Sequence, residues 1–144
     1  MRRTLAVVAA AMTIVGAGVL TETQKPAGAK PTIYDVTVTV EGAPHTGTMA
    51  LAVAGGKVSG SMHIKSPDEI TGKAAGTVKG GEMLLDFPYH MVVRKCDGNF
   101  QAAVKMPDKK APAKMTATVS ILPCGRPDGS RLPGTIELTP VTKK

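Results

Sequence analysis

Residues 47–64 read GTMALAVAGGKVSGSMHI, and residues 72–87 read GKAAGTVKGGEMLLDF. Each stretch is a run of alternating apolar and small or polar residues, a Gly-Gly pair, and a second alternating run. The second Gly-Gly pair, Gly80-Gly81, follows the first, Gly55-Gly56, by 25 residues. A two-residue glycine turn between alternating runs is typical of a β-hairpin. The stretch Gly47–Tyr89 therefore predicts two consecutive hairpins, to which the rest of the chain adds further strands.

The same alternation marks strands on both sides of these hairpins, at the period of two that places successive side chains on opposite faces. The predicted strands are Thr32–Glu41, His45–Ala54, Lys57–Lys65, Ile70–Lys79, Glu82–Phe87, Asn99–Met106, Lys114–Leu122 and Gly134–Thr139. Pro88 is expected to break or bend the sheet, with a further short strand over His90–Cys96 and a hairpin turn at Asp97-Gly98.

The fold class follows from the number and spacing of these strands. Eight or nine short strands with turn signals every 8–12 residues, and no helical pattern after residue 29, are typical of sandwiches and barrels. Because tight hairpins join the strands, we predict an antiparallel up-and-down β-barrel of about eight strands. A β-sandwich is the alternative.

The N-terminus has the pattern of a secretory signal peptide. Arg2 and Arg3 precede the charge-free, mostly apolar run Leu5–Leu20, and small residues suited to cleavage follow at Ala27-Gly28-Ala29, with Val15-Gly16-Ala17 as a second candidate. An uncleaved anchor is the alternative, although 16 residues are short for a span of about 20. We expect a signal peptide over 1–29, one domain over 30–144, and a secreted or periplasmic protein.

Charge and composition argue against nucleic-acid binding. Without residues 1–29 the chain has 15 Lys and Arg and 10 Asp and Glu, a net charge of about +5, and the cations are spread along it. The whole chain has no Trp, two Tyr and two Phe, whereas single-stranded nucleic acid is held by stacking aromatics among cations. We therefore expect no nucleic-acid partner and no membrane span after cleavage.

Two cysteines in an exported domain suggest one disulfide. Cys96 and Cys124 are the only cysteines, and they are 28 residues apart. Free or metal-bound thiols are the alternative.

Five methionines share the inward parity of their predicted strands. They are Met49, Met62, Met83, Met106 and Met115, and Phe100 has the same parity. Thioethers adapt to irregular apolar space, so these residues predict a methionine-lined pocket for a small apolar ligand. The alternative is a closed barrel whose interior the methionines fill.

Four cations lie in irregular segments, where binding residues often occur. Lys109 and Lys110 belong to one loop, and Arg126 and Arg131 to another. If the two loops share one end of the barrel, they form a basic rim for an acidic envelope partner. Ordinary solubilising charge is the alternative.

No catalytic motif is present. The chain lacks Gly-x-Ser-x-Gly, His-Glu-x-x-His and a phosphate-binding loop. The three histidines, His45, His63 and His90, are expected to be exposed, and Met62 cannot share an ion with its strand neighbour His63 because adjacent residues point to opposite faces. We predict no catalytic residue, no resident metal and no cofactor.

The glycine-flanked strands of Gly47–Phe87 resemble those of the calycin group, the small secreted barrels that include lipocalins and avidins. The resemblance implies a barrel. It carries over no ligand and no binding residue, because the chain lacks the Gly-x-Trp of lipocalins and the tryptophans of the avidin biotin site. Three functions are therefore weighed: a binding protein for a small apolar ligand, an envelope-associated interaction module, and a barrel enzyme with scattered catalytic residues.

Overall fold

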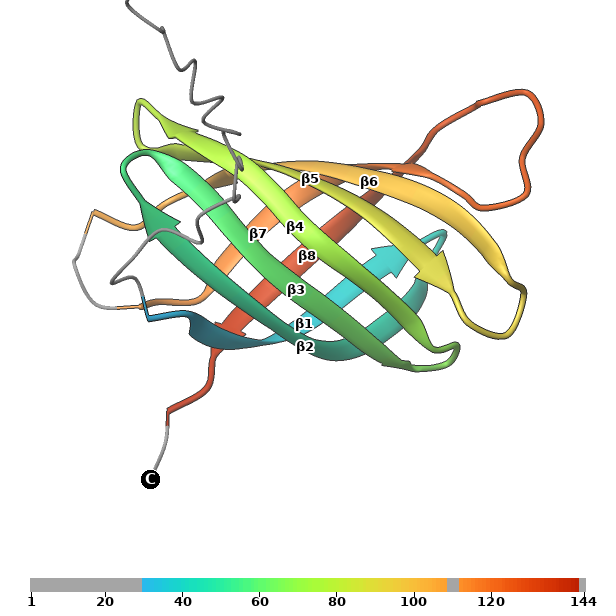
Figure 1. The fold of residues 1–144 in the computed structure, drawn as a ribbon, viewed down its shortest axis with the longest axis horizontal. Coiled ribbons are helices and arrows are strands. Elements are labelled where there is room, and N and C mark those ends of the chain that lie inside the picture. Colours follow the sequence, from blue (N-terminus) through green and yellow to red (C-terminus); the bar gives the residue numbers. More distant parts are fainter. Residues whose placement is uncertain (1–29, 109–111, 143–144) are drawn as a thin grey trace, which may run out of the picture.

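The chain forms a closed barrel of eight strands, seen in a computed structural model that describes residues 30–108 and 112–142 (Figure 1). The predicted signal peptide and the pair Lys109-Lys110 lie outside the described residues. The strands are β1 (Thr32–Val40), β2 (Ala43–Ala54), β3 (Lys57–Ser66), β4 (Ile70–Lys79), β5 (Glu82–Met91), β6 (Cys96–Lys105), β7 (Met115–Leu122) and β8 (Leu132–Pro140).

Each strand pairs antiparallel with the next, and β8 pairs with β1 to close the sheet. The predicted up-and-down barrel is therefore confirmed, and the sandwich alternative is wrong. The quoted stretch forms the hairpins β2–β3 and β4–β5. Their turns are Gly55-Gly56, with φ of 57° and 73°, and Gly80-Gly81, with φ of 60° and 77°. Two positive φ angles are what a two-residue hairpin turn of type I′ requires, so the Gly-Gly prediction is confirmed at both sites.

The prediction for residues 82–98 is wrong in two respects. β5 continues without a break through Pro88 to Met91, and Asp97 and Gly98 pair with β5 inside β6 instead of forming a turn. The turn lies at residues 92–95, where Lys95 takes a φ of 50°. The pairing between β4 and β5 is interrupted at Phe87 and Pro88. Pro88 is tolerated there because no hydrogen bond to β4 requires the N–H that proline lacks.

The inner face of the barrel is apolar and its middle is filled. Each strand alternates buried or half-buried apolar residues with more exposed, mostly polar ones. The largest side chains shut off from solvent are Phe87, Met49, Ile64, Ile136, Leu138, Val36 and Val104. The described part of the chain has no helix of the length and apolarity that crossing a membrane requires.

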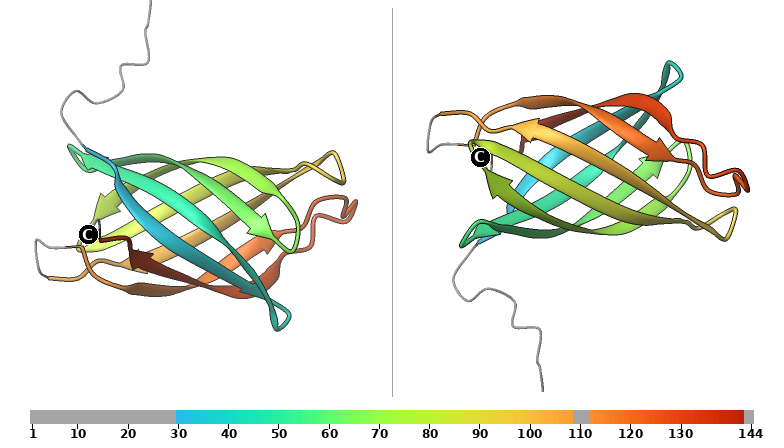
Figure 2. Two further views of the ribbon diagram at one scale, coloured as in Figure 1. Left: turned by 90° about the horizontal axis from the view of Figure 1, so that it is seen from below. Right: turned by 90° about the horizontal axis from the view of Figure 1, so that it is seen from above.

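The barrel has two distinct ends, which Figure 2 shows from two sides. At the mouth end lie the connections β1–β2, β3–β4, β5–β6 and β7–β8, namely residues 41–42, 67–69, 92–95 and 123–131. At the far end lie the two Gly-Gly turns, the described ends of the β6–β7 loop, the start of β1 and the end of β8. Of the hollows described at the two ends, the larger lies at the mouth end, with about 420 Å³ against about 260 Å³ at the far end.

Candidate binding pocket at the mouth end

The mouth end contains a half-open hollow of about 420 Å³, here called the mouth pocket. All eight strands line it, so its shape is fixed by the whole barrel. Its apolar wall consists of Val38, Val40, Met62, Ile64, Ile70, Tyr89, Met91, Phe100, Ile121 and Leu132. The volume is within the range of small-molecule sites, about 300–1,000 Å³, and a mostly apolar lining is typical of such sites.

Stacked aromatic rings close the pocket toward the core. Phe100 lines the pocket, and Phe87 lies against it with ring centroids 4.5 Å apart and planes 20° apart. Tyr89 lies beside Phe100, with ring centroids 6.4 Å apart. Since Phe87 is shut off from solvent, the pocket ends at this ring pair, and a ligand would occupy one end of the barrel only.

The rim of the pocket is polar. Glu41, Asp68 and Arg94 come from three of the four mouth-end connections. His45 lies in the third residue pair from the β1–β2 turn, opposite Val38. The Nδ1 atom of His45 is inaccessible to solvent and has no hydrogen-bond partner. The expectation of three exposed histidines is thus wrong for His45, because its position in β2 has the inward parity of Met49 and Leu51.

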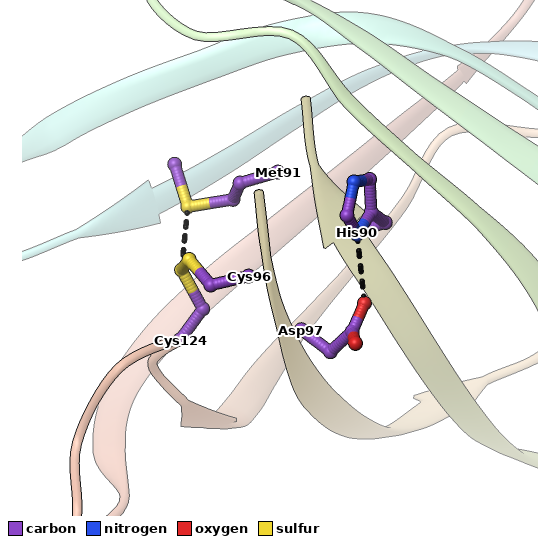
Figure 3. A network of polar contacts seen from close by, with 5 residues as sticks. All are labelled: His90, Met91, Cys96, Asp97 and Cys124. Atoms are coloured by element: carbon purple, nitrogen blue, oxygen red, sulfur yellow. Dashed lines mark hydrogen bonds and ion pairs between the residues drawn. A yellow bond between two sulfur atoms is a disulfide. The ribbon is translucent and has the colours of Figure 1, made fainter. Parts of the chain in front are cut away.

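A disulfide, here called the staple, crosslinks one wall of the pocket. Cys96 at the start of β6 and Cys124 after β7 lie at disulfide distance, with Cα atoms 5.5 Å apart (Figure 3). The sulfur of Met91 contacts that of Cys124 at 3.2 Å. The staple and the thioether therefore brace the β5–β6 and β7–β8 connections against each other beside the pocket.

Tyr89 adds a polar tie at the same wall. Its hydroxyl donates a hydrogen bond to the carbonyl of Leu122 at 3.1 Å, which reaches across β6 to the end of β7. Burial raises the pKa of the Tyr89 hydroxyl, while the backbone of Cys124 and the charge of Arg131 act in the opposite direction. The hydroxyl remains a neutral donor at neutral pH.

The six side chains predicted to line one pocket are divided among three places. Met62 and Phe100 line the mouth pocket, and Met49 is buried between the strands. Met83, Met106 and Met115 line a separate hollow of about 260 Å³ at the far end. Met91, which lines the mouth pocket, was missed because the predicted break at Pro88 ended the parity count of its strand.

Of the four cations predicted to form a basic rim, the structure describes Arg126 and Arg131, whereas Lys109 and Lys110 lie outside the described residues. Arg126 and Arg131 precede β8 at the mouth end, whereas Met106 and Met115, the described flanks of the loop with Lys109 and Lys110, lie at the far end. The guanidinium of Arg131 donates to the Ser120 hydroxyl at 2.8 Å and to the Asn99 amide oxygen at 2.9 Å. Arg131 thus ties β6 to β7 on the outer face.

The polar groups on the outer face form pairs. His63 lies 2.9 Å from Glu69, and His90 lies 2.8 Å from Asp97 (Figure 3). Figure 3 also shows Met91 directed to the opposite side from its neighbour His90, as strand geometry requires. Within residues 30–108 and 112–142, no three His, Cys, Asp or Glu side chains are grouped so that they could hold a metal ion.

Comparisons with known proteins identify no relative: no family model matches the chain, and neither the curated proteins nor the solved structures contain a match.

Proposed function

We propose that this is an exported, non-enzymatic binding protein that holds a small apolar molecule in the mouth pocket. The observation that carries the proposal is the pocket itself, a half-open hollow of about 420 Å³ whose apolar wall draws on all eight strands. Burial of an apolar ligand there would be favourable by roughly 25 cal/mol per Å² of apolar surface removed from water.

The construction of the pocket also supports binding. The closed sheet, the stacked pair Phe87 and Phe100, and the Cys96–Cys124 staple keep the wall in place without a ligand. A preformed site binds more tightly because less conformational entropy is lost on association. Met62 and Met91 supply adaptable surface inside this rigid frame.

Export is part of the proposal and rests on two features. The N-terminal pattern of Arg2, Arg3 and the run Leu5–Leu20 is that of a signal peptide. The cysteine pair is of the kind that persists in oxidising compartments such as the periplasm and the extracellular space. Together these features favour a secreted or periplasmic location.

A neutral fluorescent probe, N-phenyl-1-naphthylamine, tests the proposed binding. Titration into the oxidised protein should give a saturable rise in emission at micromolar protein. Ile70→Trp places a large ring in the pocket wall and should weaken probe binding by about tenfold or more, which corresponds to about 1.4 kcal/mol. Thr118→Trp adds the same ring on the exposed outer face of β7 and should leave binding unchanged.

Two results would contradict the proposal. One is the absence of a saturable signal with the folded, oxidised protein. The other is equal probe affinity in Ile70→Trp and Thr118→Trp, which would mean that the probe binds outside the mouth pocket.

A further inference from the structure

We infer that the ligand of the mouth pocket carries a neutral oxygen acceptor, such as a ketone, aldehyde or ester carbonyl, which accepts a hydrogen bond from His45. This inference rests on the proposed function and specifies its ligand. Three observations support it: His45 lines the pocket, its Nδ1 atom is buried without a hydrogen-bond partner, and the rim carries charged side chains of both signs.

The first step is the direction of the imidazole. His45 pairs with Val38 across β1 and β2, and Val38 is buried on the inner face. Directly paired residues in neighbouring strands point to the same face, so the imidazole is directed inward. It is the only histidine among the residues that line the mouth pocket.

The second step is the tautomer of the ring. In neutral imidazole one nitrogen carries the hydrogen and the other accepts. Nδ1 of His45 is buried without a partner in either tautomer, and buried N–H groups without an acceptor are rarer in proteins than buried acceptors without a donor. The hydrogen therefore belongs on Nε2, and His45 offers the pocket a donor.

The third step is the partner of that donor. An N–H group in a half-open apolar pocket selects an oxygen acceptor on the ligand, because a purely apolar ligand would displace water from the donor and leave it unpaired. The other side chains that line the pocket below the rim are apolar, apart from the Tyr89 hydroxyl, which is bonded to the Leu122 carbonyl, so the rest of the ligand is apolar as well.

The fourth step is the charge of the acceptor. Glu41 and Asp68 bring two carboxylates to the rim, and Arg94 brings one guanidinium; Glu41 and Arg94 are exposed, and Asp68 is half-buried. A carboxylate ligand would meet no excess of positive charge there, and like charges close together repel. A neutral oxygen needs no positive partner and is not repelled by the rim carboxylates, which favours a carbonyl compound over a fatty acid.

Displacement of N-phenyl-1-naphthylamine by a matched eight-carbon series tests the inference. We expect 2-octanone to displace the probe at about three- to tenfold lower concentration than octane or octanoate, the range that one net hydrogen bond provides. His45→Phe should remove the advantage of 2-octanone over octane, with each displacement measured against the variant's own affinity for the probe. His63→Phe, on the outer face of β3, should keep that advantage.

The outcomes separate the two proposals. Probe binding with no preference for 2-octanone over octane would overturn the inference about His45 and leave the proposed function standing. Stronger displacement by octanoate than by 2-octanone would also overturn it, because the neutral acceptor would then be the wrong class. Loss of all probe binding in the wild-type protein would instead contradict the proposed function.

A measurement on the wild-type protein keeps the test valid if His45→Phe does not fold. Nitrogen-15 NMR of the imidazoles should show His45 with its hydrogen on Nε2, and addition of 2-octanone should shift the Nε2 resonance in a saturable way. A hydrogen on Nδ1, or no shift at saturating ketone, would refute the inference.

Discussion

Tyr89 and Gly98 show how a single residue pair shapes the pocket wall. They lie directly opposite each other in β5 and β6, and the ring of Tyr89 covers the backbone of Gly98 on the inner face. A Cβ atom at position 98 would collide with Cζ and Oη of Tyr89 and lie 2.7 Å from the carbonyl oxygen of Leu122. An aromatic ring laid over a strand glycine compensates for the missing side chain.

Gly98→Val is expected to destabilise the fold. The added side chain must displace the Tyr89 ring and break its hydrogen bond to Leu122, at a cost of about 1–3 kcal/mol for overpacking. Urea denaturation measures the change in the free energy of unfolding. Ala103→Val, on the exposed face of the same strand, should change it by less than about 0.5 kcal/mol. Equal values for the two variants would mean that the ring does not cover Gly98.

The two tyrosines predict a loss of stability at alkaline pH. Burial raises the pKa of Tyr34 and Tyr89 above the usual value of 10.0. A group whose pKa is raised by folding stabilises the folded state fully below its unfolded pKa, and this stabilisation is lost as the pH rises through the folded pKa. The free energy of unfolding should therefore fall above about pH 10, the unperturbed value for tyrosine.

Absorbance at 295 nm measures this titration directly, because the chain contains two Tyr and no Trp. Both tyrosines of the folded protein should ionise at a higher pH than those of the urea-unfolded chain. Tyr89→Phe should leave one delayed transition, that of Tyr34. Coincident titration of folded and unfolded protein would contradict the burial of both hydroxyls.

Side-chain direction was predictable residue by residue, but contacts were not. Alternation placed Met49, Met62 and Phe100 on the inner face, and they lie there. The turn predicted at Asp97-Gly98 was wrong, although this dipeptide taken alone is a strong hairpin signal. Only the neighbouring strand explains it, since Gly98 lies under the Tyr89 ring, a contact that joins residues far from the local pattern.

At the scale of the element, the glycine turns are the features that the sequence specified best. A two-residue turn of type I′ needs positive φ at both central residues, and glycine adopts such angles without a steric penalty. The Gly-Gly pairs therefore set both the position and the register of β2–β3 and β4–β5. The strand β5 was harder to predict because a proline usually ends pairing, whereas here the ladder of β4 is interrupted beside it.

Gly81→Ala tests the turn of β4–β5. The φ angle of Gly81 is 77°, and no atom lies within 4 Å of the position that a Cβ would take, so the cost comes from the backbone alone. We expect a loss of about 1–2 kcal/mol in the free energy of unfolding, the penalty of the left-handed conformation for an L-residue. Lys79→Ala, at the exposed end of β4, is the control and should cost much less. A value for Gly81→Ala within the error of this control would rule out the positive φ angle.

At the scale of the whole molecule, the distribution of space inside the barrel could not be read from the sequence. Alternation shows which residues point inward, but the tilt and stagger of the strands determine how they fill the interior. As a result the predicted methionines divide between the mouth pocket and the far-end hollow, while Phe87 and Met49 fill the middle. His45 was missed as a pocket residue because its polar side chain was expected at the surface, although its position has the inward parity of Met49 and Leu51.

The disulfide links the stability of the barrel to the shape of its pocket. Cys96 and Cys124 are 28 residues apart, and a loop of this length predicts about 3–4 kcal/mol of stabilisation through restriction of the unfolded chain. The double variant Cys96→Ser and Cys124→Ser should lose roughly this amount in urea denaturation. Because the staple joins β6 to the β7–β8 loop beside Met91, the variant should also bind N-phenyl-1-naphthylamine more weakly.

Reduction separates this effect from the substitutions themselves. Dithiothreitol should lower the stability of the wild-type protein toward that of the double variant and should leave the variant unchanged. A stability that is insensitive to both reduction and substitution would show that the two thiols are not bonded. Lower stability with unchanged probe affinity would show that the strands, rather than the staple, hold the mouth pocket open, since the closed sheet would then preserve the wall without it.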